Sequence, residues 1–574
     1  MYNLEYKRWL DSPALTEDER SELLAISDNE DIKMLRFSSP MDFGTAGLRS
    51  TMYMGLGCMN RFTVRQATLG MAELILQADG AARGVAIAYD SRNNSRLFAE
   101  ISARTLAARG IKSYIFTDIR PTPELSFAVL ELSCIAGINI TASHNPKEYN
   151  GYKAYWQDGA QISPEQARIV KEAIAKYDCL DMTCDMSYDA AVSKGLIVEL
   201  SEDFDEKYMT AVLKTMKDES LISSVADELK VVYTPLHGAG YRLVPEAFRR
   251  AGLKHLYTVD SQMIPDGNFP TVKKPNPEYA DVFALGIDIA NEVGSDLVIA
   301  TDPDSDRVGV VARDKNGEFK TISGNQMGAL LLDYVIGAER RAGRLNASSY
   351  AVKSLVSTDM ANRICAFNGV RLHEVLTGFK FIGEVMNNYE AKGEGDGFLL
   401  GFEESYGYLL GTYARDKDAV EASLIILEMT AYYKAENKTL IDALNDLYEK
   451  YGYFAERTVD VYMEGADGIE RRKRVMSSLR SVPPSEIGGI KVSKIGDYMD
   501  GIVTELSTQA TEPTGQSRSD VLYYTLTSGD KIIVRPSGTE PKIKIYVLAN
   551  GEDTEALERK VNTYINDAKR MTEV

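Results

Sequence analysis

Cysteine is scarce in this sequence: there are five in 574 residues, and no two of them form a C-x-x-C pair. The number is odd and the positions are scattered, so the sequence predicts neither a disulfide framework nor a zinc site. Long apolar runs are also missing, and none approaches the roughly 18–20 residues that span a bilayer. The N-terminal residues lack the basic-then-apolar layout of a signal peptide. We therefore expect a soluble, cytoplasmic protein that does not associate with membranes.

Positive charge is in deficit. Sixty-five Lys and Arg stand against 84 Asp and Glu, which gives a formal net charge of −19 at pH 7. An acidic surface repels polyanions, so nucleic acid is not an expected partner. Any anionic ligand needs a locally positive pocket. Composition leaves monomer and dimer equally open.

The length predicts several domains, because a domain typically has about 100–200 residues and 574 residues then correspond to about three to five. Short apolar runs that end in polar loops and are followed by helical periodicity occur at residues 85–89, 137–140, 231–233 and 297–300. This alternation predicts parallel α/β sheets, whose ligands gather at the carboxyl ends of the strands. From about residue 451 the pattern becomes strand-rich, with a helix from Thr554, which predicts a final α+β domain.

The domain boundaries are predicted in stretches without periodicity. Residues 178–194 are polar and suggest a linker near residue 200, and a second break follows near residues 314–317. The predicted domains are residues 1–200, 201–318, 319–450 and 451–574.

The segment DPDSDR follows an apolar run and places Asp302, Asp304 and Asp306 at alternate positions. Such a density of hard oxygen ligands suits Mg²⁺. An EF-hand is excluded, because Arg307 stands where that loop needs glycine and Arg313 where it needs glutamate. The alternative is a solvated acidic turn. The adjacent arginine favours a metal site that also holds an anion.

The segment TASHNP, residues 141–146, follows another apolar run, and Lys153 lies ten residues beyond Ser143. We do not expect Ser143 and His144 to form part of a catalytic triad, because consecutive side chains on extended backbone point apart. A nearby metal and phosphate chemistry would activate the serine instead. A capped turn is the equally open alternative.

Two further segments offer ligand-binding chemistry. RPSGTEP, residues 535–541, has a guanidinium, two hydroxyls and a glycine, which suit a phosphate cradle or, alternatively, a hairpin turn. The spacing G-x-x-x-x-G-K-[ST] is absent, so a P-loop is not expected. FEESYG, residues 402–407, offers carboxylates and a hydroxyl to sugar hydroxyls, or forms an acidic first helical turn.

The segments FGTAGLR, TASHNP with NGYK, DPDSDR, TGFK, FEES and RPSGTEP, in this order, resemble the α-D-phosphohexomutase superfamily. The similarity is greatest to its phosphoglucomutase/phosphomannomutase members and extends to the phosphopentomutase branch, from about residue 43 to about residue 546. The resemblance implies an α/β fold with three related mixed- or parallel-sheet domains and a C-terminal α+β domain around a central cleft. It also implies an isomerase that acts as an intramolecular phosphotransferase.

The resemblance implies a role for each matching residue. Ser143 would carry the phosphoryl group as phosphoserine and would ligate one Mg²⁺ together with Asp302, Asp304 and Asp306. The residues implied in substrate binding are Arg49, Lys153, Arg307, Thr377, Gly378, Glu403, Ser405, Arg535, Ser537, Gly538 and Thr539.

The resemblance specifies the general acid/base less strongly. Where some family members have histidine, this chain has Gly407 and Phe379. Other members use a lysine in a segment that residues 416–418 resemble imperfectly. Lys417 is therefore the first choice, and the helpers are Lys380, His144 and Lys153.

The implied reaction interconverts glucose 1-phosphate and glucose 6-phosphate through phosphoserine and bound glucose 1,6-bisphosphate, which is also the primer. Phosphomannomutase or phosphopentomutase activity and sugar bisphosphate synthesis are the alternatives within the superfamily. A haloacid-dehalogenase-like phosphatase would leave the segments of Ser143 and Arg535 unexplained. A silent sugar-phosphate-binding protein would not need every core position. The bisphosphate must stay bound while it reverses its orientation, and this requires a closed cleft. We therefore expect the last domain to move.

Overall fold

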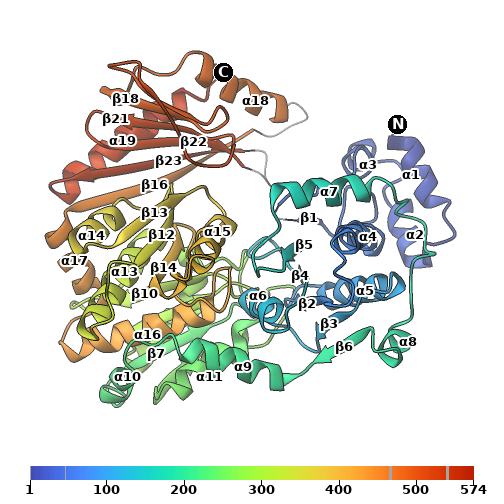
Figure 1. The fold of residues 1–574 in the computed structure, drawn as a ribbon, viewed down its shortest axis with the longest axis horizontal. Helices are drawn as coiled ribbons and strands as arrows, with labels where there is room; N and C mark the ends of the chain where they lie inside the picture. The colour runs from blue at the N-terminus through green and yellow to red at the C-terminus, as the bar shows by residue number, and fades with distance from the viewer. Residues whose placement is uncertain (1, 46, 464–467, 538–541, 574) are drawn as a thin grey trace. The chain divides into compact units, whose positions relative to one another are not determined.

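The computed structural model describes residues 2–45, 47–463, 468–537 and 542–573 (Figure 1). The chain forms two compact units. Unit 1 comprises Met1–Ile322, Gly383–Phe398 and Tyr406–Thr439, and unit 2 comprises Ser323–Ile382, Leu399–Ser405 and Leu440–Val574.

The first sheet of unit 1 has six strands in the order β1 (Leu48–Thr51), β5 (Tyr149–Trp156), β4 (Ala136–Ile140), β2 (Val85–Tyr89), β3 (Ser113–Phe116) and β6 (Ile197–Leu200). Strands β4, β2, β3 and β6 pair in parallel, whereas β5 and β1 are antiparallel. The strands predicted at residues 85–89 and 137–140 are thereby confirmed. The helices that pack around this sheet are α4 (Arg61–Gln77), α5 (Ser95–Ala108), α6 (Thr122–Glu131) and α7 (Pro164–Ile174).

The polar stretch at residues 178–194 is partly helical. It contains α8 (Tyr188–Ser193), and Ala191 of this helix is buried in the core of the first sheet. Before that sheet, α1 (Tyr2–Leu10), α2 (Glu17–Leu24) and α3 (Glu30–Phe37) form a small cluster around the buried Trp9.

The second sheet of unit 1 has the order β11 (Phe319–Ile322), β10 (Val308–Arg313), β9 (Leu297–Thr301), β7 (Lys230–Thr234) and β8 (His255–Thr258). Strands β9, β7 and β8 are parallel, as the apolar runs predict, and β10 and β11 are antiparallel. Against it pack α11 (Gly240–Arg250), α12 (Ala284–Val293) and, from later in the chain, the almost wholly buried α16 (Ala419–Ala435).

Unit 2 begins with strands β13 (Arg371–Val375), β12 (Tyr350–Ser354) and β14 (Phe398–Glu403), in this order. Its helices include α13 (Gly324–Arg341), α14 (Met360–Asn368) and α17 (Leu440–Tyr451), and α15 (Phe379–Glu390) starts in this unit.

The C-terminal part of unit 2 is a sheet in the order β16 (Tyr453–Tyr462), β23 (Lys542–Gly551), β22 (Lys531–Pro536), β21 (Leu522–Leu526), β18 (Ile490–Asp497), β19 (Ile502–Glu505) and β20 (Thr511–Pro513), with β17 (Glu486–Ile487) on β18. All these pairs are antiparallel. Helix α18 (Gly468–Ser481) and the predicted terminal helix, α19 (Thr554–Arg570), accompany it. The fold is therefore α/β, with a β-rich C-terminal domain.

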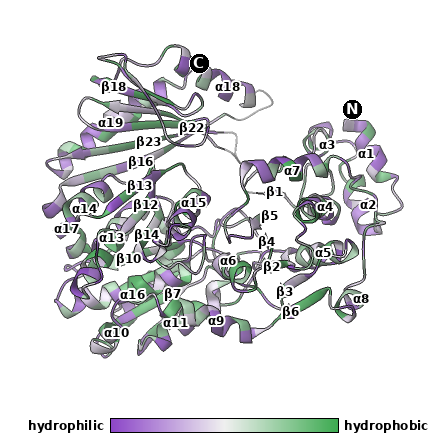
Figure 2. Ribbon diagram, in the orientation of Figure 1, coloured by the Kyte–Doolittle hydropathy of each residue, from purple (hydrophilic) through white to green (hydrophobic). Residues whose placement is uncertain are grey.

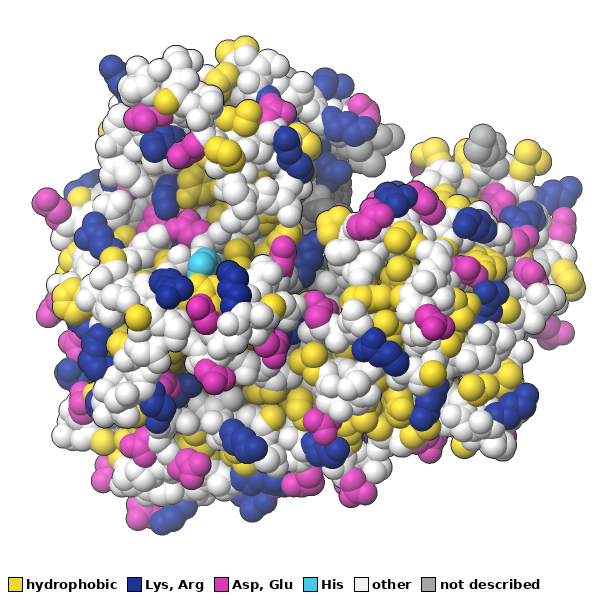
Figure 3. Space-filling model, in the orientation of Figure 1, with side chains coloured by type: hydrophobic (Ala, Val, Ile, Leu, Met, Phe, Trp, Pro, Cys, Tyr) yellow, Lys and Arg dark blue, Asp and Glu magenta, His cyan; other side chains and the backbone are white. Residues whose placement is uncertain are grey.

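The surface agrees with the composition. Hydrophobic and hydrophilic residues alternate along outer helices such as α7 and α19 (Figure 2). Acidic and basic side chains are interspersed over the face seen in Figure 3. In the described part of the chain no helix has the length and apolarity to span a bilayer. All five cysteines are free thiols, and four of them are buried.

Candidate functional site

The serine loop follows β4 and brings Ser143 against the acidic loop that follows β9. The Ser143 hydroxyl donates a hydrogen bond to Asp302 Oδ2 at 3.0 Å, and the serine is only 3% exposed. Both loops leave the carboxyl ends of parallel strands, where the sequence predicts ligand-binding groups.

The expectation that Ser143 and His144 point apart is wrong. Ser143 Oγ lies 3.1 Å from His144 Nδ1. Ser143 has φ of +52°, in the left-handed region, so the backbone is not extended here and the neighbouring side chains meet. Burial, with Arg307 and Arg49 nearby, holds the pKa of His144 well below its usual value. The imidazole is therefore neutral beside the serine.

Arg92 and Asp90, in the loop after β2, hold the serine loop in place. The buried Arg92 guanidinium donates to the carbonyl of Ser143 at 2.5 Å and to that of Pro146 at 2.9 Å. Asp90 accepts the hydroxyl of Thr141 at 2.6 Å, and Thr141 in turn accepts the backbone N–H of Ser143 at 2.8 Å. Neither residue belongs to the set of site residues predicted from the sequence. The one feature of the sequence that could have indicated Asp90 and Arg92 is their place in a polar loop directly after the apolar run at residues 85–89.

The three aspartates of DPDSDR form one buried cluster. Asp302 and Asp304 are fully buried and Asp306 is 2% exposed, and one oxygen of each lies within 4.8 Å of the others. Asp302 Oδ1 accepts the backbone N–H groups of Asp306 and Arg307. The sequence prediction that these carboxylates gather is confirmed.

The cluster suits a divalent cation. Oδ1 of Asp304 and Oδ1 of Asp306 are buried and have no hydrogen-bond partner in the part of the chain that the structure describes. A buried carboxylate oxygen without a hydrogen bond is energetically unfavourable. Burial, followed by the charges of Asp304 and Asp306, raises the pKa of Asp302 well above its usual value. A bound hard cation would coordinate the oxygens that lack hydrogen bonds and would offset the repulsion among the three carboxylates. Mg²⁺ prefers a ligand set of oxygens only.

The loop after β7 supports the aspartate loop by close backbone approach. A Cβ at Gly238 would lie 2.4 Å from the Cα of Pro303, so only glycine fits there. The N–H of Ala239 donates to the Pro303 carbonyl at 2.8 Å. The segment HGAG therefore fixes the position of the metal-ligand candidates.

Two buried lysines face the cluster. Lys153 Nζ lies 2.7 Å from Asp304 Oδ2, and Lys417 Nζ lies 3.2 Å from Asp306 Oδ2. Against the effect of burial, the two lysines hold the pKa of Asp306 below its usual range. Against the same effect, Asp304 and Asp306 raise the pKa of Lys153, which keeps its charge. The lysines thus supply local positive charge within an acidic chain.

Gly407 makes room for Lys417. A Cβ at position 407 would lie 2.1 Å from Lys417 Cδ. The lysine is fixed further by Asp416, whose Oδ1 lies 2.8 Å from its Nζ and whose Oδ2 accepts the Tyr155 hydroxyl at 2.7 Å. The absence of a side chain at position 407 therefore leaves the space that the lysine side chain fills.

Two further arginines of the predicted site belong to unit 1. Arg49 donates to Asn145 Oδ1 at 3.1 Å, beside the serine loop, and Arg307 donates to Glu278 at 2.6 Å. Both belong to the predicted substrate-binding set.

The remaining predicted residues lie in unit 2. The Gly378 N–H donates to Glu403 Oε1 at 2.7 Å, and Arg535 is hydrogen-bonded to Thr377 Oγ1. Burial and the charge of Glu403 raise the pKa of the adjacent Glu404. The structure thus joins the TGFK, FEES and RPSGTEP segments within one unit.

Three further residues of the predicted set are described in unit 2. Ser405 follows β14 and is half-buried, and Lys380 lies over the ring of Phe381 at 4.8 Å in the first turn of α15. Ser537 donates its N–H to the Lys542 carbonyl at 2.9 Å, in the connection between β22 and β23. Gly538 and Thr539 lie outside the described residues.

A buried serine that touches a carboxylate cluster, with cations close by, is the equipment of an enzyme that transfers a phosphoryl group. The family models named phosphoglucomutase/phosphomannomutase alpha/beta/alpha domains I, II and III match residues 40–180, 206–317 and 323–451. The phosphoglucomutase of Staphylococcus aureus strain N315 is 36% identical over 533 residues, which are 92% of this chain and 93% of that protein. The chain belongs to the phosphoglucomutase/phosphomannomutase family, and it is an isomerase.

Solved structures share the fold. A putative phosphomannomutase from Thermus thermophilus superposes with a TM-score of 0.69 at 22% identity and covers 93% of this chain and 100% of its own. Parafusin, a phosphoglucomutase from Paramecium in its open form, superposes with a TM-score of 0.67 at 18% identity. The match covers 94% of this chain and 95% of parafusin. At these identities the likeness establishes the architecture alone.

Proposed function

We propose that this chain interconverts glucose 1-phosphate and glucose 6-phosphate, with Ser143 as the phosphoryl carrier and glucose 1,6-bisphosphate as primer and intermediate. The observation that carries the proposal is the hydrogen bond of 3.0 Å between Ser143 Oγ and Asp302 inside the aspartate cluster. The full-length similarity to a phosphoglucomutase supports the choice of glucose.

The proposed metal ligands are Asp302, Asp304, Asp306 and an oxygen on Ser143. Among the described residues, buried Oδ1 atoms of Asp304 and Asp306 have no hydrogen-bond partner, which supports this assignment. A bound Mg²⁺ would neutralise charge on the transferring phosphoryl group. Arg92 and Asp90 would keep the serine oxygen in line for the transfer.

The proposed chemistry is the same in both half-reactions. The bond between phosphorus and Ser143 Oγ breaks as a bond from phosphorus to the free sugar hydroxyl forms, and the hydroxyl proton passes by way of Lys417 to Ser143 Oγ. The bisphosphate then turns over, and its other phosphate returns to Ser143 with the proton moving in the opposite direction. Arg49, Lys153 and Arg307 would stabilise the charge, and His144 would orient the serine hydroxyl.

Unit 2 supplies recognition in this proposal. Glu403 and Ser405 would bind sugar hydroxyls, with Thr377 and Gly378 beside them and Lys380 as a further cation. Arg535, Ser537, Gly538 and Thr539 would bind the distal phosphate. Because one cradle serves both orientations of the sugar, a single set of these residues suffices. We retain the four domains, residues 1–200, 201–318, 319–450 and 451–574, as part of the proposal.

Substrate choice is tested by comparing the turnover of the 1-phosphates of glucose, mannose, glucosamine and ribose, each with a trace of its bisphosphate. We expect glucose 1-phosphate to have the highest kcat/KM. A preference for mannose or ribose would replace glucose in the assignment, and release of inorganic phosphate would contradict a mutase altogether.

A further inference from the structure

Thr122, the first residue of α6, is not in the predicted set of site residues, yet it contacts the aspartate cluster. Its hydroxyl donates a hydrogen bond to Asp304 Oδ2 at 2.8 Å, and its backbone N–H donates to the Asp304 carbonyl at 2.8 Å. Both residues are fully buried. The start of α6 therefore holds Asp304 at two points, one on its side chain and one on its backbone.

Asn139 on β4 supports the Thr122 hydroxyl from the other side. Its Nδ2 donates to Thr122 Oγ1 at 2.6 Å, and Asn139 is also fully buried. The threonine oxygen accepts this hydrogen bond while its own proton points to Asp304, because a carboxylate oxygen is an acceptor. The three side chains form a relay that ends on the carboxylate.

The first sheet supplies a second donor to the same carboxylate oxygen. Lys153 lies directly opposite Asn139 in the antiparallel register of β4 and β5, so both side chains leave the same face of the sheet. Lys153 Nζ donates to Asp304 Oδ2 at 2.7 Å. Asp304 Oδ2 is thus held by the lysine directly and by the asparagine through Thr122.

This arrangement separates the roles of the two oxygens of Asp304. Oδ2 accepts two hydrogen bonds, whereas Oδ1 is buried and has no hydrogen-bond partner among the residues that the structure describes. Hydrogen bonds to a metal-ligating carboxylate fix its orientation and are part of what sets metal affinity. The donors on Oδ2 therefore leave Oδ1 as the oxygen for the proposed cation.

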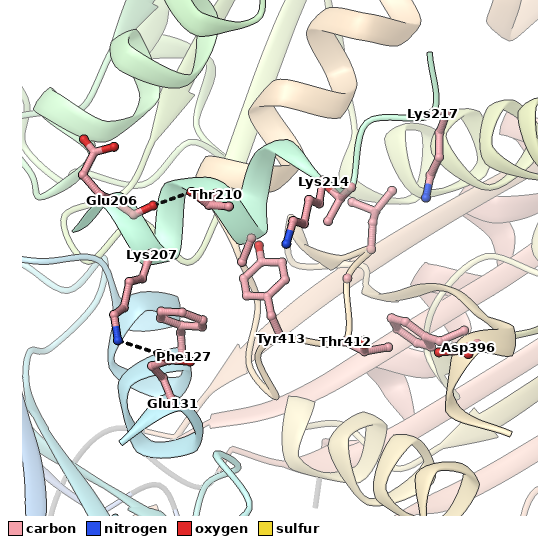
Figure 4. Close-up of a pocket in the computed structure, with 15 residues that line it drawn as sticks. Phe127, Glu131, Glu206, Lys207, Thr210, Lys214, Lys217, Asp396, Thr412 and Tyr413 are labelled. Carbon is pink, nitrogen blue, oxygen red and sulfur yellow. Dashed lines mark hydrogen bonds and ion pairs between the residues drawn. The ribbon is translucent and has the colours of Figure 1, made fainter. Parts of the chain in front are cut away.

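Helix α6 gives the threonine a rigid support. The ring of Phe127 packs 5.8 Å from the ring of Tyr208, and Glu131 pairs with Lys207 at 2.8 Å. Tyr208 and Lys207 both belong to α9 (Glu202–Leu213), and Figure 4 shows the pair of Glu131 and Lys207 beside a cavity of unit 1. A group on a helix that is fixed along its length is positioned more precisely than one on a loop.

We propose that Thr122 is a positioning residue of the metal site, which acts through Asp304 by holding Oδ2 so that Oδ1 is left for the cation, and that Asn139 supports it. The inference rests on the proposed function, because it uses the metal ligands assigned there. Binding of the cation is measured apart from turnover, so a failure of the inference and a failure of the proposed function give different results.

Cation binding is tested on the full chain with Mn²⁺ as the probe, by following the electron paramagnetic resonance signal of free Mn²⁺. Carboxylate sites that suit Mg²⁺ also take Mn²⁺, and displacement by Mg²⁺ assigns the bound ion to the shared site. Thr122→Val keeps the shape of the side chain and removes the hydroxyl, so it should weaken binding about tenfold or more. Thr122→Ser keeps the hydroxyl and should bind within about threefold of the wild type.

Two further variants separate the hydroxyl from packing. Thr122→Ala loses the hydroxyl without placing a methyl group beside the carboxylate, so it should match Thr122→Val even if the latter folds poorly. Thr105→Val is the matched control: Thr105 is equally buried, and its hydroxyl donates to the Ile101 carbonyl at 2.8 Å within α5. This variant should bind Mn²⁺ as the wild type does.

Three outcomes of the titration would overturn the inference. Equal Mn²⁺ affinity in the wild type and the variants without the hydroxyl would leave the metal site intact and remove the role of Thr122. Equal weakening in Thr122→Ser and Thr122→Val would show that shape and not the hydroxyl matters. A wild type that binds no Mn²⁺ displaceable by Mg²⁺ would contradict the proposed metal site and the inference together.

Turnover gives a second readout. Thr122→Val should need about tenfold more Mg²⁺ for half-maximal turnover, while its KM for glucose 1-phosphate stays constant and its kcat at saturating Mg²⁺ stays within about threefold of the wild type. A higher KM with an unchanged Mg²⁺ requirement would place Thr122 in sugar binding and contradict the inference. If the chain lacks mutase activity, the Mn²⁺ titration still decides the role of Thr122.

Discussion

The two units hold their candidate residues in different ways. In unit 1, loops after β2, β4 and β9 are joined by buried hydrogen bonds, and the three aspartates are at most 2% exposed. In unit 2, the link between Glu403 and Gly378 and that between Thr377 and Arg535 join the corresponding segments, and Ser405 is half-buried. Reacting groups need fixed geometry before substrate arrives, whereas groups that bind a sugar in two orientations gain from latitude. Under the proposed function, unit 1 performs the chemistry and unit 2 recognises the substrate.

The largest effect is expected when one negative charge is removed from the aspartate cluster, which tests whether unit 1 performs the chemistry. Asp306→Asn should lower kcat on the order of 10³-fold with little change in KM, because it loses transition-state stabilisation by the cation. Steady-state kinetics with a magnesium titration measures both. Asp288→Asn, exposed on α12, is the matched control. A loss confined to KM would place Asp306 in recognition.

The reciprocal change is made in unit 2. Arg535→Ala should lower kcat/KM about 10²-fold, mainly through KM, because a bidentate contact to the distal phosphate is lost. Arg559→Ala, on the exposed face of α19, should leave both constants unchanged. An effect on kcat alone would remove the distinction between the units.

The position of Lys417 is probed through Gly407. Gly407→Ala places a methyl group 2.1 Å from Lys417 Cδ, so the lysine must move. We expect kcat to fall roughly 30-fold and the free energy of unfolding to fall by about 1–3 kcal/mol. Gly337→Ala in α13, where the nearest atom is a flexible arginine terminus at 3.3 Å, is the control. An unchanged kcat would transfer the acid/base role to Lys153 or Lys380.

The smallest expected effect concerns the clamp on the serine loop. Arg92→Lys keeps the charge but cannot reach several carbonyls at once, so kcat should fall about tenfold while KM stays constant. Arg96→Lys, on the exposed face of α5, is the control. A change in KM without a change in kcat would show that Arg92 serves binding and does not position Ser143.

The alternation of apolar runs and polar loops predicts the strands of unit 1 well, because buried parallel strands read as continuous apolar runs. That Ser143 and Asp302 meet is implied only by the resemblance to the superfamily, because the two residues follow strands of different sheets. The contact between Ser143 and His144 could not be predicted, because a positive φ at a serine leaves no mark in the sequence. Arg92 was missed for a related reason: its partners are backbone carbonyls, which every sequence has.

The division into two compact units could not be predicted from the sequence either. Residues 383–398 and 406–439 belong with the first 322 residues, because they pack there and not because of their composition. Lys417 therefore shares a unit with Ser143, whereas Glu403 does not.

The central claim, that the reacting group is a serine of unit 1, is tested most directly by following ³²P from labelled glucose 1,6-bisphosphate into the protein. Peptide mass spectrometry should place the phosphate on Ser143, and a chase with unlabelled glucose 6-phosphate should return the label to sugar. Ser143→Ala should take up none and should lose turnover. Label on another residue, or normal turnover in Ser143→Ala, would contradict the account.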